Sequence, residues 1–243
     1  MNNDTSNTIK NNGSSAKTPN DVTSSLNNID ALSQYLKTTA GVREGRPIPP
    51  LEKWNPQSVT DMDLVIKANG EWWHEGGRVT RESLVSLFAS ILWKEEDNGI
   101  TEYFLKTPVQ KIRIQVEDVP LLINDVGIIN EGDDSWLEFT TTTGDVVRLD
   151  DEHLITLKAY NSKDNSSTTN KINNAANMED GQGVTIETPV RPYMAVRNNL
   201  TALISRNTFY HLTEIGELSE SDGETILTLR SGGKSYQLSM PTD

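Results

Sequence analysis

The spacing of apolar residues separates a polar start from a structured body. Residues 1–20 hold almost no apolar side chains, so they cannot bury enough surface to offset the loss of chain entropy, and we predict a disordered tail. After Asp21 the pattern changes to an apolar residue at every third or fourth position. This period predicts a short amphipathic helix, and the residues that form its apolar stripe are Val22, Leu26, Ile29, Leu32 and Leu36.

A proline-rich stretch follows this helix. Residues 46–56 contain four prolines, which remove backbone donors and favour extended geometry. We predict an extended strap anchored on the body by Trp54, so that residues 21–56 form a helix and a strap. A proline-rich ligand for a protein partner is the alternative use of such a stretch.

Residues 57–108 alternate between strand and helix patterns. The dipeptide Asn69-Gly70 lies between two strand-like runs, 63–66 and 71–74, and predicts a hairpin. Thr80 is a good N-cap for a helix that is predicted to end near Lys94. A strand over residues 103–105 completes a predicted α+β domain.

The pattern after Pro108 is mostly β, and we predict a second domain over residues 109–243. A polar stretch at 161–183 predicts a mobile loop within it. A helix is expected over 207–215, with Gly216 at its C′ position. The expected strands are 111–116, 121–129, 136–141, 146–149, one long strand over 193–204, and a closing hairpin of 225–229 and 236–239.

Two segments repeat one pattern. Residues 79–87 and 204–212 both read apolar, hydroxyl, Arg, any, hydroxyl, apolar, apolar, any, Leu. If the hydroxyl residue is the N-cap in each, Arg81 and Arg206 occupy N1, where the helix dipole disfavours a cation by about 0.3–1 kcal/mol. The pair therefore indicates a shared task, which is either a structural ion pair or contact with an anionic ligand.

A second repeated pattern, which we call the second echo, accompanies the first. Tyr103-x-Leu105-x-x-Pro108 recurs as Tyr236-x-Leu238-x-x-Pro241. We therefore predict an internal duplication: an α+β fold of two related strand–helix–strand units, with a seam between them where a site would form.

Composition limits the function. The net charge of -13 falls entirely after residue 40, because residues 1–40 hold three Asp and three Lys. An acidic body repels phosphate backbones and anionic lipids, so we expect neither nucleic acid nor a membrane as partner. The absence of Cys excludes disulfides and thiolate sites, and no secretory signal or membrane span is visible, which predicts a cytoplasmic protein.

Catalytic and metal motifs are weak. His74, His153 and His211 are far apart, so no zinc site is predicted, and no cofactor is expected. Gly233-Lys234-Ser235 resembles the end of a phosphate-binding loop, but Thr228 stands where that loop needs Gly. His74 is the most interesting histidine, because it follows Trp72-Trp73 and precedes two glycines.

Several strings taken together resemble a known family. They are Pro49-Pro50-Leu51-Glu52-Lys53-Trp54-Asn55-Pro56, Gly70-x-Trp72-x-His74-x-Gly76, Val109-x-Lys111-x-x-Ile114-x-Val116-x-Asp118, Pro192-Tyr193-x-x-Val196-Arg197 and Leu200-x-Ala202-Leu203-x-x-Arg206-x-x-Phe209-Tyr210-x-Leu212. In these strings the chain resembles the bacterial domain-of-unknown-function 1285 family. The resemblance implies a duplicated α+β fold, a C-terminal half similar to a partly open antiparallel barrel of the pleckstrin-homology type, and a groove between the halves for a nucleotide-like ligand in signalling.

The leading hypothesis is a regulatory or signalling module that binds a small anionic or nucleotide-like ligand in that groove. A protein-interaction scaffold is the alternative, with a protein as its partner. A hydrolase-type enzyme using Asp118 or Asp61 with His74 is the third possibility. The predicted ligand-binding residues are Arg81, Arg206, Arg197, Tyr193, Trp72 and His74.

Overall fold

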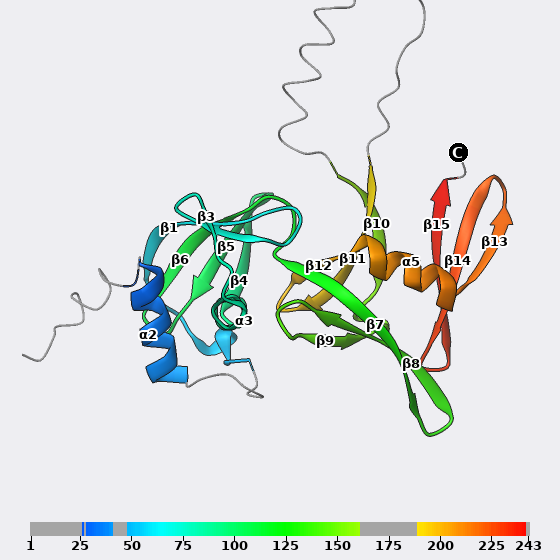
Figure 1. Ribbon diagram of the computed structural model, residues 1–243, viewed down its shortest axis with the longest axis horizontal. Helices are drawn as coiled ribbons and strands as arrows, with labels where there is room; N and C mark the ends of the chain where they lie inside the picture. Colours follow the sequence, from blue (N-terminus) through cyan, green and yellow to red (C-terminus); the bar gives the residue numbers. More distant parts are fainter. Residues whose placement is uncertain (1–25, 27, 41–47, 161–188, 242–243) are drawn as a thin grey trace, which may run out of the picture.

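The computed structural model describes residue 26 and residues 28–40, 48–160 and 189–241. The fold is mostly sheet with few helices, in two similar halves that lie side by side in Figure 1. The predicted tail at 1–20 and nearly all of the predicted loop at 161–183 lie outside the described residues. No helix of the described part is long and apolar enough to cross a membrane.

The N-terminal half is built on the six-stranded sheet A. Its strand order is β3-β2-β1-β6-β5-β4, so that β6 lies in the centre and pairs in parallel with β1. The strands are β1 (Ser58–Ile66), β2 (Trp72–His74), β3 (Gly77–Arg78), β4 (Leu92–Asp97), β5 (Ile100–Lys106) and β6 (Gln110–Val116).

Two helices cover sheet A. Helix α2 (Ile29–Ala40) buries Leu32 and Leu36, as the predicted stripe requires. It begins at Ile29 because the Asn28 side chain accepts a hydrogen bond from the backbone N–H of Asp30 (2.8 Å). Helix α3 (Glu82–Ala89) connects β3 to β4, and the short helix η1 (Leu51–Lys53) lies in the strap with Leu51 fully buried.

In its described residues the C-terminal half contains two sheets and one helix. Sheet B has the order β10-β11-β12-β7-β8-β9, with a central parallel pair of β12 and β7, and sheet C has the order β13-β14-β15. Apolar side chains of both halves form one buried cluster. The elements are β7 (Leu121–Glu131), β8 (Asp134–Thr141), β9 (Val146–Arg148), β10 (Ile155–Ala159), β11 (Val190–Arg197), β12 (Leu200–Ile204), α5 (Arg206–Ile215), β13 (Glu217–Ser221), β14 (Glu224–Ser231) and β15 (Lys234–Pro241).

The two six-stranded sheets share one arrangement. In each sheet the first and last strands pair in parallel at the centre. The other strands follow outward from the first strand in sequence order and from the last strand in reverse order. The repeated helices do not share a place in this arrangement, because α3 lies between the third and fourth strands of sheet A while α5 follows the last strand of sheet B. The second echo also falls on different strands, Tyr103 on β5 and Tyr236 on β15. The two halves are similar, but not in the alignment that the echoes predicted, and the duplication itself remains a prediction.

Several element predictions need correction. The predicted helix ends at Ala89 rather than near Lys94, because Leu92 to Asp97 pair with β5. The predicted strand over 193–204 is a hairpin, since Asn198 and Asn199 both adopt positive φ. Sheet A extends through β6, so the change of sheet follows Val116 instead of Pro108. The prediction omitted β10 and β13, and Gly216 is extended rather than left-handed.

Candidate functional site

A short linker between β6 and β7 carries polar contacts to both halves. Glu117 accepts hydrogen bonds from Lys67 Nζ (2.6 Å) and from the backbone N–H of Ala68 (3.0 Å), both in the β1–β2 turn. The bond from Lys67 lowers the pKa of the Glu117 carboxyl below its ordinary value. The linker is thereby fixed to the N-terminal half.

Asp118 makes the matching contacts to the C-terminal half. Its two carboxylate oxygens accept the Tyr193 hydroxyl at 3.0 and 2.9 Å, and Oδ2 pairs with Arg191 Nη1 at 2.9 Å. The Asp118 side chain is only 10 % exposed, so these contacts are weakly screened. Burial, with the hydrogen bond to Asp118, raises the pKa of Tyr193, so the phenol stays a donor.

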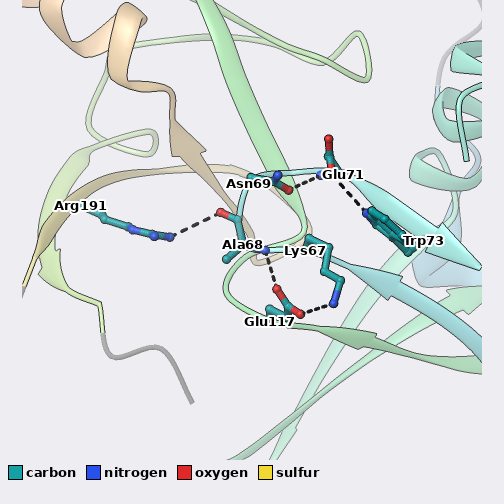
Figure 2. Close-up of a pocket in the computed structure, with 7 residues that line it drawn as sticks. All are labelled: Lys67, Ala68, Asn69, Glu71, Trp73, Glu117 and Arg191. Carbon is teal, nitrogen blue, oxygen red and sulfur yellow. Dashed lines mark hydrogen bonds and ion pairs between the residues drawn. The ribbon is translucent and has the colours of Figure 1, made fainter. Parts of the chain in front are cut away.

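Arg191 extends this contact back to the N-terminal half. Its guanidinium lies 3.4 Å from the centre of the Tyr160 ring, and Nη1 donates to the Ala68 carbonyl oxygen at 3.4 Å. Figure 2 shows the side chain pointing at the β1–β2 turn. Residues of both halves therefore meet at this turn.

Gly70 brings the same turn against β7. Its φ is +85°, and a Cβ built there would lie 2.9 Å from Leu122 Cβ. Any side chain would therefore be strained and would push the two halves apart. The predicted turn is confirmed, and the structure adds that its glycine permits the approach of the halves.

Arg197 joins the halves at a second point. Its Nε donates to Asp145 Oδ1 (2.7 Å), and its Nη2 donates to the carbonyl oxygen of Ala89 (2.7 Å). Ala89 is the last residue of α3, so the cation lies at the negative end of that helix. Arg197 Nη1 is buried and has no partner within the described residues.

A cleft between the halves opens beside the β1–β2 turn, and we call it the inter-half cleft. It has a volume of about 550 Å³. Apolar walls, hydroxyls, side-chain amides and the ion pair of Arg78 with Glu71 (3.2 Å) line it, and Glu82 adds a further carboxylate, so its interior is polar with a small negative charge. Its lining is Asn69, Gly70, Glu71, Trp72, Arg78, Val79, Thr80, Glu82 and Val85 from one half and Leu122, Asn124 and Thr142 from the other.

A shallower pocket of about 390 Å³ lies on the same turn, and we call it the turn pocket. Lys67, Glu117, Arg191 and Trp73 line it (Figure 2). It shares Asn69 and Glu71 with the inter-half cleft, so the two hollows are neighbours at that rim. The turn pocket therefore adds two cations to one end of a mostly neutral cleft.

A third pocket, of about 610 Å³, follows β9 and includes Ile48 of the strap. Its ionisable residues already have partners, Arg148 with Glu138 (3.2 Å), His153 with Asp150 (2.9 Å) and Arg197 with Asp145 (2.7 Å), and of their buried side-chain nitrogen and oxygen atoms only Nη1 of Arg197 has none within the described residues. Closed pairs leave few groups for a ligand. The inter-half cleft and the turn pocket are the better candidates.

The predicted ligand-binding residues do not gather in one place. Trp72 is a wall of the inter-half cleft, whereas Tyr193 and Arg197 make the contacts between halves described above. Arg81 is the exposed N-cap residue of α3 and lines none of the three pockets. Arg206 donates to Tyr210 Oη on its own helix (2.9 and 3.1 Å), and His74 Nδ1 lies 2.7 Å from the Asp63 carbonyl oxygen.

Sequence reasoning missed the residues that the second half contributes. Asn124 and Thr142 are exposed polar residues on and just after strands of sheet B. In the sequence they occupy polar positions of an alternating strand pattern, as any solvent-facing residue does, so nothing marked them as part of a site. No group of three or more His, Cys, Asp or Glu side chains in the described part could hold a metal ion.

The Lys67–Glu117 pair predicts a pH dependence of stability. The lowered pKa of Glu117 means that its contribution is present above the ordinary value of 4.5 and is lost as the pH falls through the folded-state value. Glu117→Gln is expected to cost about 0.5 kcal/mol at pH 7, because the pair is partly exposed, and almost nothing near pH 3. Urea unfolding of both proteins across this range measures the difference. A difference that stays constant or grows on acidification contradicts the assignment.

Comparisons with known proteins agree on one family. A model described as "Domain of unknown function (DUF1285), N-terminal domain" matches residues 49–119, and one described as "Protein of unknown function (DUF1285), C-terminal domain" matches residues 167–238. The comparison with curated proteins gave no match.

Two solved structures are similar. A DUF1285 family protein from Silicibacter pomeroyi DSS-3 is 30 % identical with a TM-score of 0.61, and the match covers 84 % of this chain and 94 % of that one. A DUF1285 family protein from Shewanella baltica OS155 is 26 % identical with a TM-score of 0.38, over 62 % of this chain and 90 % of that one.

Proposed function

This chain belongs to the DUF1285 family, whose description gives no activity, and we propose from its geometry that it is a regulatory module that binds a small nucleotide-like ligand in the inter-half cleft. The observation that carries the proposal is the cleft of about 550 Å³ lined by residues of both halves. Such concave, mostly pre-formed sites between domains are where small ligands usually bind.

The lining of the cleft favours a planar, polar group. Val79 and Leu122 provide most of the apolar surface, because Trp72 is only 3 % exposed, while Asn124, Thr80 and Thr142 provide amide and hydroxyl groups. Side-chain amides can donate and accept at once, which suits the mixed donors and acceptors of a nucleobase or a sugar. Arg78 and Glu71 neutralise one another and Glu82 leaves one negative charge in the lining, so the cleft itself suits a neutral polar group better than an anion.

The turn pocket suits the anionic end of the same ligand. Lys67 and Arg191 line the turn pocket, which shares Asn69 and Glu71 with the inter-half cleft. Their acids, Glu117 and Asp118, also stand close by, which limits the site to a single phosphate or carboxylate group. Of the residues predicted from sequence as ligand contacts, only Trp72 lies in the lining of the cleft, and at 3 % exposure it supports the wall more than it offers a stacking surface.

A regulatory role would follow from the position of the site. A ligand that binds more tightly when both halves contact it stabilises that arrangement, by an amount that rises with the logarithm of its concentration over Kd, so occupancy is coupled to the arrangement of the halves. We also propose that the C-terminal half is a partly open barrel of the pleckstrin-homology type. Sheets B and C are joined by the hydrogen bond from the backbone N–H of Leu137 to Ser231 Oγ (3.1 Å), as two sheets of one barrel would be. The parallel pair of β7 and β12 means that the barrel is not the purely antiparallel one that the resemblance implied.

Binding can be tested on the full chain with a panel of nucleoside monophosphates, cyclic nucleotides and inorganic phosphate. We expect at least one nucleotide, but not phosphate alone, to raise the unfolding temperature and to give a saturable titration heat. Asn124→Ala should weaken that binding about tenfold, since it removes an exposed amide of the cleft.

Asn130→Ala is the matched control, because Asn130 lies on the same strand, β7, but lines none of the three pockets. If no compound of the panel raises the unfolding temperature or gives a saturable titration heat, the proposal is overturned. A response that Asn124→Ala and Asn130→Ala reduce equally overturns the assignment to this cleft.

A further inference from the structure

Strand β13 has an uncovered outer edge. All five of its residues are exposed, and in Figure 1 it is the outermost strand of sheet C, on the side away from the N-terminal half. Leu218 is 55 % exposed although its cross-strand partner Leu227 is fully buried. Directly paired residues lie on the same face of a sheet, so Leu218 extends the buried face to an edge that nothing described covers.

The backbone of β13 has hydrogen-bonding groups directed outward. Asp222 and Gly223 adopt φ of 54° and 78°, which makes a two-residue type I′ turn closed by the pair of Ser221 and Glu224. Because hydrogen-bonded and non-bonded pairs alternate along an antiparallel ladder, the N–H and C=O groups of Leu218 and Glu220 point away from β14. Within the described part of the chain, no strand pairs with that side.

The charge of the residues around β13 determines which kind of partner strand can pair with its outer edge. Residues 214–224 hold five acids, Glu214, Glu217, Glu220, Asp222 and Glu224, and no Lys or Arg. Pairing of two copies through β13 would bring two such acidic sets together, which is unfavourable. A segment with basic side chains gains from the same field.

We propose that β13 is a strand-addition site for an extended, basic segment of a protein partner. The partner strand hydrogen-bonds to Leu218 and Glu220, places an apolar side chain opposite Leu218, and places Lys or Arg opposite Glu220. In such complexes main-chain bonds provide affinity and alternate side chains provide specificity. This surface is on sheet C, so it works independently of a ligand in the inter-half cleft.

A symmetric peptide tests the proposal without assuming a strand direction. In the capped peptide Thr-Lys-Thr-Val-Thr-Lys-Thr, Val opposite Leu218 places one Lys opposite Glu220 in either direction. We expect saturable binding to the full chain that weakens with salt. The same peptide with Glu in place of Lys should bind at least about tenfold more weakly.

Two variants separate the backbone contact from the charge. Leu218→Pro removes one outward N–H while leaving the bonds to β14, and it should abolish binding without changing the unfolding temperature. Glu220→Lys should reverse the preference, so that the Glu peptide binds better than the Lys peptide. Asn124→Ala in the inter-half cleft should leave the affinity for both peptides unchanged.

Absence of binding by the Lys peptide overturns the proposal, and so does equal binding to Leu218→Pro and the original chain. An unchanged peptide preference in Glu220→Lys also overturns it. Should Leu218→Pro fail to fold, the charge reversal at Glu220 still decides.

Discussion

Replacing Asp118 by alanine is expected to lower the free energy of unfolding by about 3 kcal/mol. The carboxylate is 10 % exposed and receives both the Tyr193 hydroxyl and Arg191 Nη1. Its removal leaves a buried phenol and a cation without their acceptor, although Arg191 is 28 % exposed and regains part of its hydration. Urea unfolding followed by tryptophan fluorescence measures the loss.

Milder substitutions separate the contribution of the ion pair from that of the hydrogen bonds. Asp118→Asn keeps an acceptor for Tyr193 but loses the ion pair, and Tyr193→Phe loses only hydrogen bonds, so each should cost about 1–2 kcal/mol. The double variant Asp118→Ala/Tyr193→Phe should cost less than the sum, because the two groups act on each other. Additive losses, or an Asp118→Ala protein as stable as the original, would show that the linker contact contributes little.

Gly232→Ala is expected to be similarly severe, with a loss of about 3 kcal/mol. Gly232 joins β14 to β15 at φ +57°, and a Cβ there would lie 2.3 Å from Trp136 Cη2. Its N–H donates to the Ser135 carbonyl oxygen (2.9 Å), so the turn cannot move away without losing the bond between sheets B and C. Thermal and urea unfolding measure the change.

Gly132→Ala isolates the steric part of this effect. Gly132 has a nearly equal φ of +62°, but a Cβ there meets nothing within 4 Å. It should cost only about 1 kcal/mol, from backbone strain alone. In Gly232→Ala/Trp136→Leu the smaller side chain should recover part of the loss. Equal effects of Gly132→Ala and Gly232→Ala would contradict the role of the Trp136 contact.

Much of the local structure was predictable because it depends on neighbouring residues. Asn69-Gly70 gave the predicted turn, since its glycine supplies the positive φ. Ile91 and Leu92 misled the helix prediction, because apolar residues at helical spacing also fit a buried turn residue followed by the first residue of β4, the only buried residue of that strand. Asn198-Asn199 is a turn that the surrounding apolar run concealed, and the exposed, polar β13 carries no strand pattern.

The site was less predictable because its contacts are between distant segments. The repeated pattern predicted the same helix position for Arg81 and Arg206. In the structure Arg81 is itself the N-cap residue of α3. Arg206 follows the N-cap residue of α5, Ser205, whose side chain accepts a hydrogen bond from the backbone N–H of Thr208. Arg197 was predicted to bind a ligand, and it donates to the end of α3 in the other half. A single sequence does not reveal such a partner, since Ala89 accepts through its backbone, whatever its side chain.

The strand orders of sheets A and B constrain how the chain can fold during synthesis. In each sheet the strand made last, β6 or β12, is the one that joins two groups of strands made earlier. A nascent chain that ends before that strand therefore carries hairpins with open edges and no complete sheet. Each half can consolidate only in one late step after its last strand leaves the ribosome, and until then its edges are the natural target of chaperones.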